Sequence, residues 1–171
     1  MPVIENTGQN TIDIRVGFND MKSKIKRNIS VFAKRYAEQG ENKFSFVSLS
    51  SEEELLLSDY MHKAVHDVVS QLAQVLHTYE EEDAYVTFTV TNTRWDVSSV
   101  DEFKKAFAFS VVDYCISSVV SDYFGMYFPN QAQHFLRRAN EIMANLIRLC
   151  YYKQPKEESA SYLSSTTGTT I

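Results

Sequence analysis

His62 and His66 stand four residues apart in the sequence HKAVH. In a helix this spacing places both imidazoles on one face, as in the two-histidine edge of a metal site. Zinc enzymes of the HExxH type carry a glutamate after the first histidine, whereas this chain has Lys63 there. Asp59 shares the face and Asp67 lies near it, but no third ligand is evident. We therefore predict two solvent-facing histidines, no bound metal and no cofactor, and keep a metal-dependent enzyme as a third hypothesis.

Other local signatures of catalysis are missing from the sequence. There is no GxSxG elbow, Walker loop or GxGxxG turn, and the 5 glycines leave little material for a phosphate cradle. The carboxylates of SEEEL (51–55) and EEED (80–83) are typical of helix ends and solvated acidic runs. We therefore predict that the protein is not an enzyme.

Composition favours a single domain built from long regular elements. The 171 residues are 44% hydrophobic, with 11 Phe and 10 Tyr but only 5 Gly and 3 Pro. The net charge of −5 argues mildly against nonspecific wrapping of nucleic acid. Cys115 and Cys150 lie in apolar surroundings outside any CxxC pair, so we expect buried, reduced thiols.

We expect the protein to be made in a cytoplasm and to have no membrane contact. The N-terminal sequence MPVIENTGQN has neither the basic nor the apolar region of a signal peptide. The most apolar stretch, 103–128, is interrupted by two lysines and two aspartates, which makes it too polar for a membrane span.

The pattern of apolar residues predicts a mainly α fold: a bundle of about four helices with a small antiparallel β element and an extended C-terminal arm. We place a single helical domain at 1–155, divided into 1–49 and 50–155, and the arm at 156–171. The predicted helices cover about 19–37, 51–79, 100–124 and 130–152, and the predicted strands cover 11–16, 43–49 and 84–90. We expect the strand at 84–90 to face the one at 43–49.

The first predicted helix is strongly basic. It has no acid between Asp20 and Glu38, and its cations are Lys22, Lys24, Lys26, Arg27, Lys34 and Arg35. Such a face either binds a phosphate backbone or an acidic protein surface, or is simply a solvated amphipathic face. An acidic protein surface is the better partner, because identical subunits carrying EEED could meet this helix in a ring-closing contact.

Aromatic residues are more abundant than a small helical core requires. The helix predicted at 100–124 is apolar on nearly every side, which indicates a central helix or one shared with a neighbouring subunit. The arm is polar except for Tyr162, Leu163 and Ile171. A segment of this kind cannot fold alone, but it can become ordered on a partner by filling pockets or adding a strand.

The helical half, about 50–155, resembles small proteins of tailed phages of gut Bacteroidales and, in layout, the head–tail connector (adaptor, neck) proteins of tailed phages. The residues that carry the resemblance are LSSEEELLLSDYMHKAVHDVVSQLAQVL, RWD, FKKAFAFSVVDYCISSVV and the ending FLRRANEIM…LCYYKQP. Residues 1–49 fall outside it.

The resemblance implies a structural virion protein. It implies a homo-oligomeric ring, dodecameric in the family, seated under the portal protein and beside other neck and tail proteins. DNA would pass through its channel without sequence-specific binding. By position, Tyr162, Leu163 and Ile171 would anchor the arm on the portal or on adjacent subunits. The rival hypothesis is a cytoplasmic regulatory or nucleic-acid-binding helical protein that uses Lys22, Lys24, Lys26 and Arg27 in helix 20–37.

We predict that deletion of residues 156–171 leaves the domain folded but impairs assembly, because the arm holds partner contacts and not the core. Circular dichroism during heating should show that the shortened chain still folds and unfolds cooperatively, while its association with the portal ring should weaken. If the shortened chain assembles normally, the arm is only a tail.

Overall fold

The computed structural model describes residues 11–38, 51–91 and 100–151. Within these ranges the mainly α fold with a small antiparallel sheet is confirmed. In chain order the elements are β1 (Thr11–Gly17), α1 (Phe18–Glu38), α2 (Ser51–Gln71), β2 (Leu76–Glu81), β3 (Tyr85–Thr91), α3 (Val100–Gly125) and α4 (Pro129–Tyr151). The predicted strand at 43–49 and the arm at 156–171 lie outside the described residues.

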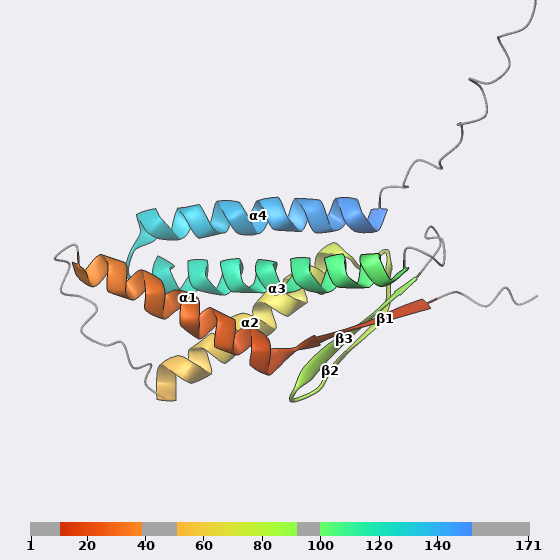
Figure 1. The fold of residues 1–171 in the computed structure, drawn as a ribbon, viewed down its shortest axis with the longest axis horizontal. Coiled ribbons are helices and arrows are strands. Elements are labelled where there is room, and N and C mark those ends of the chain that lie inside the picture. The colour runs from red at the N-terminus through yellow and green to blue at the C-terminus, as the bar shows by residue number, and fades with distance from the viewer. Residues whose placement is uncertain (1–10, 39–50, 92–99, 152–171) are drawn as a thin grey trace, which may run out of the picture.

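Helix α3 lies at the centre of the domain (Figure 1). It forms an antiparallel hairpin with α4, while α1 and α2 cross its other side, and the sheet packs near the end where α3 begins. The sequence GMYFPN ends α3, because Gly125 closes the helix and Pro129 starts α4. None of the described helices is both long enough and apolar enough to span a membrane.

The sheet has the strand order β1–β3–β2 and is antiparallel throughout. Alternate residues of β1 and β3 are buried, as the alternation of apolar and polar residues predicts. The buried face meets α3 through Phe88, whose ring lies 5.6 Å from that of Phe107. On the opposite face the Thr89 hydroxyl donates to Asp13 over 2.8 Å.

The prediction of a helix reaching residue 79 was wrong. Helix α2 ends at Gln71, and the chain turns at Leu72, whose carbonyl accepts from the backbone N–H groups of Val75 and Leu76. Residues 76–81 then form β2 along the second edge of β3. The apolar spacing at 72–79 suits a helix, but the open hydrogen-bonding edge of β3 stabilises the strand instead.

The predicted pairing of the strand at 84–90 with 43–49 was also wrong. Strand β3 is the central strand, and its two edges are occupied by β1 and β2. The acidic run EEED therefore belongs to the β2–β3 hairpin and not to a helix end. In this hairpin the backbone N–H of Glu82 donates to the carbonyl of Tyr85 over 2.8 Å.

Helix α4 covers α3 with one amphipathic face. Its buried residues are Ala132, Phe135, Ala139, Met143, Leu146 and Cys150. The apolar residues of this helix also include Leu136, for which its hydropathy alone predicts an inward position, but Leu136 is 51% exposed, because it lies about 100° around the helix from the stripe centred on Phe135. Both cysteines are buried and free, as predicted.

We predict that Phe107→Ala and Phe109→Ala differ sharply in stability although they are neighbours on α3. Phe107 is fully buried, whereas Phe109 is 68% exposed. Removal of the buried ring should lower the free energy of unfolding by about 3–5 kcal/mol, whereas removal of the exposed ring leaves no cavity in the core and should cost far less. Urea titration followed by circular dichroism measures both. Equal losses would contradict the described orientation of α3.

Candidate functional site

The two histidines of HKAVH join helix α2 to the β2–β3 hairpin. Both are exposed, as predicted. The Nδ1 atom of His62 is hydrogen-bonded to Glu81 over 2.5 Å, and that of His66 lies 3.3 Å from the Tyr79 hydroxyl. No cluster of three or more metal-ligating side chains occurs among the residues that the structure describes. Sequence reasoning missed these contacts because it placed Tyr79 in the helix and Glu81 in the acidic run that ends it.

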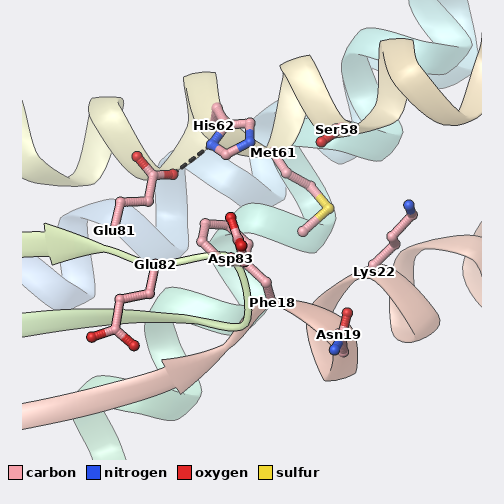
Figure 2. A pocket seen from close by; sticks show the side chains of 9 residues that line it. All are labelled: Phe18, Asn19, Lys22, Ser58, Met61, His62, Glu81, Glu82 and Asp83. Atoms are coloured by element: carbon pink, nitrogen blue, oxygen red, sulfur yellow. Dashed lines mark hydrogen bonds and ion pairs between the residues drawn. The ribbon is translucent and has the colours of Figure 1, made fainter.

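A polar pocket of about 440 Å³ opens beside His62, between the hairpin, the start of α1 and the middle of α2 (Figure 2). Phe18 forms part of its wall, with its ring 5.4 Å from the His62 ring. The other residues that line it are Asn19, Lys22, Ser58, Met61, Glu81, Glu82 and Asp83. Its three carboxylates outnumber its one lysine, so the pocket repels anions and gives Lys22 an acidic environment within its own chain.

The basic helix is partly neutralised by carboxylates of the same domain. Lys24 forms an ion pair with Asp20 over 2.8 Å, and Lys26 forms one with Glu54 over 2.5 Å. The hydrogen bond and charge of Lys26 hold the pKa of Glu54 below its ordinary value. Arg27 is exposed and has no ion-pair partner within the described ranges. Of the four predicted partner-binding cations, two thus form ion pairs within the described residues, and Lys22 lines the acidic pocket.

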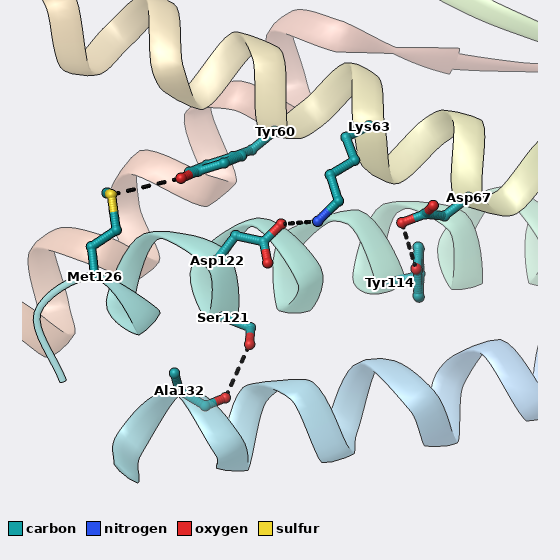
Figure 3. Close-up of polar contacts among 8 residues, drawn as sticks. All are labelled: Tyr60, Lys63, Asp67, Tyr114, Ser121, Asp122, Met126 and Ala132. Carbon is teal, nitrogen blue, oxygen red and sulfur yellow. Dashed lines mark hydrogen bonds and ion pairs between the residues drawn. The ribbon is translucent and has the colours of Figure 1, made fainter. Parts of the chain in front are cut away.

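Polar contacts also line the boundary between α2 and α3 (Figure 3). Lys63 donates to Asp122 over 2.7 Å, and this hydrogen bond raises the pKa of Lys63. Near the end of α3 the Tyr60 hydroxyl reaches the Met126 sulfur over 3.7 Å. The Ser121 hydroxyl donates to the Ala132 carbonyl and thereby connects α3 to α4. These contacts connect α3 to α2 on one side and to α4 on the other.

The most exposed aromatic ring on α3 lines a shallow surface groove, which we call the α3 groove. Phe109 is 68% exposed there. The groove has a volume of about 370 Å³ and is bordered by Arg15, Val16, Gly17, Asp20, Lys24, Lys105, Ala108, Phe109 and Val112. It combines three cations and one carboxylate with an apolar floor. Tyr85 lies next to the groove and is 44% exposed. The Arg15 guanidinium, which borders the groove, lies 5.3 Å from the centre of the Tyr85 ring.

A second exposed apolar surface, the turn patch, consists of Met126 and Tyr127 between α3 and α4. These residues are 48% and 46% exposed. The turn patch and the α3 groove lie near opposite ends of α3. Periodicity could not locate either surface, because the sequence of α3 is apolar on nearly every side. The surplus of aromatic residues was the one sequence signal that predicted exposed apolar surfaces, and it did not locate them.

The predicted arm anchors Tyr162, Leu163 and Ile171 lie outside the described residues, so their role stays a prediction. Comparison with protein-family models, with curated proteins and with solved structures finds no match for this chain. The two exposed apolar surfaces and the polar pocket are the surface features of the described residues that can take part in binding.

We predict that alkaline pH destabilises the fold through its buried acids. Burial raises the pKa of the Cys115 and Cys150 thiols to about 12 each. An unfolded thiol ionises near pH ~8.5, so the unfolded chain loses these protons first and stability is lost as pH rises from there toward 12. Urea titrations at several pH values should show a free energy of unfolding that falls through this window.

The double variant Cys115→Ala, Cys150→Ala is the control for this prediction. Its stability at neutral pH should be lower, because two buried groups are truncated, but its decline with pH should be shallower. Burial also raises the pKa of Tyr114 to about 12, so part of the decline should remain. An unchanged slope in the double variant would show that the thiols do not contribute.

Proposed function

We propose that this chain is a non-enzymatic structural protein that assembles into a homo-oligomeric ring in the head–tail connector of a tailed phage. The ring would join the portal to the tail and continue the DNA channel. The subunit would be assembled in the host cytoplasm and would reside in the neck or tail of the virion. The observation that carries this proposal is the presence of two different exposed apolar surfaces near opposite ends of α3.

The separation of these surfaces favours a ring over a symmetric dimer. Phe109 and Met126 are 17 positions apart, which corresponds to about 25 Å along a helix axis. Two unlike surfaces that meet each other form a heterologous contact, and repetition of this contact closes a ring when the rotation permits. Burial of an exposed Phe side chain contributes roughly 1.5–3 kcal/mol, so Phe109 is a suitable anchor for such a contact.

The resemblance in the helical half of the chain supplies the biological setting. It implies a portal protein and neighbouring neck or tail proteins as partners, and DNA that passes without sequence-specific binding. Under this proposal the arm with Tyr162, Leu163 and Ile171 contacts components beyond the subunit. Helices α3 and α4 would build part of the ring wall.

The alternative of a nucleic-acid-binding protein receives less support. Lys22 lines the acidic pocket, while Lys24 and Lys26 form ion pairs with carboxylates. A phosphate backbone would have to displace these acids, and it would meet a chain of net charge −5. Tight DNA binding with a steep salt dependence, abolished by neutralisation of Lys22, Lys24, Lys26 and Arg27, would instead favour the alternative.

We predict that Phe109→Asp and Met126→Asp each weaken ring assembly and leave the fold intact. Both positions are exposed in the subunit, so the new carboxylate would be buried only when the heterologous contact forms. Mass photometry of the full chain with the portal ring of the same phage should show fewer bound subunits for each variant. Gln133→Asp, an exposed polar position on α4, is the matched control and should assemble normally. A wild-type chain that stays monomeric and does not join the portal ring would overturn the proposal.

Mixing the two variants separates a heterologous contact from a symmetric one. Phe109→Asp subunits retain the turn patch and Met126→Asp subunits retain the α3 groove, so a mixture still contains one intact pairing. On the portal ring, cross-linking of the mixture should therefore give dimers but no larger oligomers. Cross-linking of either variant alone should give neither dimers nor larger oligomers. Absence of pairs from the mixture would contradict the assignment of these surfaces to one contact.

A further inference from the structure

The α3 groove combines an apolar floor with positive charge at its border. Phe109 and Ala108 belong to the floor, and Lys105 and Arg15 stand beside them. Lys105 is exposed and makes no ion pair with any described residue. Lys24 pairs with Asp20, which leaves the charges of Lys105 and Arg15 unbalanced at the groove. A complementary ligand is an extended peptide with carboxylates followed by large apolar side chains.

The chain itself contains such a peptide beyond α4. The sequence KEESASYL has Glu157 and Glu158 four to six residues before Tyr162 and Leu163. In an extended chain, Glu158 and Tyr162 are separated by about 13 Å. On α3, Phe109 and Val112 lie four and seven positions beyond Lys105, or about 6 and 10 Å along the axis. The extended segment is therefore long enough to place its acids at Lys105 and its apolar pair on the apolar floor at the same time.

The direction of the chain agrees with this spacing. Helix α4 runs antiparallel to α3 and ends at Tyr151, beside the beginning of α3 (Figure 1). A segment that leaves this end and follows α3 meets Lys105 before Phe109, so its acids reach the lysine before its apolar pair reaches the floor. Residues 152–157 can extend over roughly 20 Å, which is enough to bring Glu157 to Lys105.

Attachment to α4 gives the segment a large advantage over a separate molecule. A short linker raises the effective concentration of a tethered ligand to the millimolar range, so even a weak contact is populated within one chain. We propose that residues Glu157–Leu163 of the same chain occupy the α3 groove in the free subunit, with the acids at Lys105 and Arg15 and the apolar pair on Phe109. This inference concerns the free subunit and does not depend on the proposed function.

If the proposed function also holds, the covered groove gives assembly an order of events. A free subunit with its groove occupied would not pair with other copies, and capture of the arm by the portal would uncover Phe109. Assembly would then begin on the portal and not in free solution. This consequence rests on the proposed function, whereas occupancy of the groove by the arm does not.

Disulfide trapping in the full chain tests the proposal. The variant Ala108→Cys, Ser161→Cys places one thiol in the groove and one beside Tyr162, and it keeps Phe109 and the apolar pair intact. The native Cys115 and Cys150 are buried and do not compete under native conditions. Mild oxidation of the dilute protein by diamide should give a monomer with an internal disulfide, visible as a faster band on a non-reducing gel.

Gln133→Cys, Ser161→Cys is the matched control, because Gln133 is exposed in the first turns of α4, far from the groove. The groove pair should be trapped at least about tenfold faster than this control, reflecting the higher effective concentration. Equal rates would overturn the proposal. Disulfide-linked dimers that increase with protein concentration would also overturn it, since they would assign the groove to the arm of a second copy.

A third variant tests the chemistry of the contact. Tyr162→Ser and Leu163→Ser, added to the groove pair, should slow trapping by about tenfold, because the tether then has no apolar anchor. An unchanged rate would mean that random collisions cause the trapping, and the proposal would fail. None of these measurements involves the portal, so they succeed or fail separately from the test of ring assembly.

Discussion

Helix α3 carries apolar side chains around most of its circumference, and such a helix is stable in water only when neighbours cover it. The structure meets this requirement with α1, α2, α4 and one face of the sheet. Aromatic contacts connect these layers, as between Phe32 of α1 and Phe135 of α4, whose rings lie 4.8 Å apart. These four neighbours do not enclose α3 completely, and they leave one part of its surface exposed. That surface contains Phe109.

Charged residues at the boundaries fix how the layers meet. Lys63 and Asp122 join α2 to α3, Lys26 and Glu54 join α1 to α2, and His62 holds the hairpin through Glu81. Each exposed pair contributes little free energy, typically below about 1 kcal/mol. Their effect is on geometry, because each pair favours one relative position of two elements. Two of the lysines that suggested an external partner in the sequence, Lys24 and Lys26, are therefore engaged within the domain, and the α3 groove has more cations than carboxylates.

How far the sequence predicted the fold depended on local signals. Helices α3 and α4 were predicted to within a residue or two, since acids or proline mark their starts and GMYFPN separates them. The end of α2 was missed, because Leu72, Val75 and Tyr79 have helical spacing. The candidate site was predicted only as a surplus of aromatic residues. The positions of Phe109 and Leu136 outside the core depend on neighbouring elements that a periodic pattern does not specify.

The sequence by itself determined the helical segments at α1, α3 and α4 and the alternating strands β1 and β3. These elements follow from capping residues and periodicity, which act between residues close in the chain. Only the tertiary structure decided that residues 76–81 form a strand, because the free edge of β3 supplies their hydrogen bonds. It also decided which side of α3 stays uncovered. A helix that is apolar all round has no intrinsic outer face, so the packing of its neighbours alone leaves Phe109 exposed in the α3 groove.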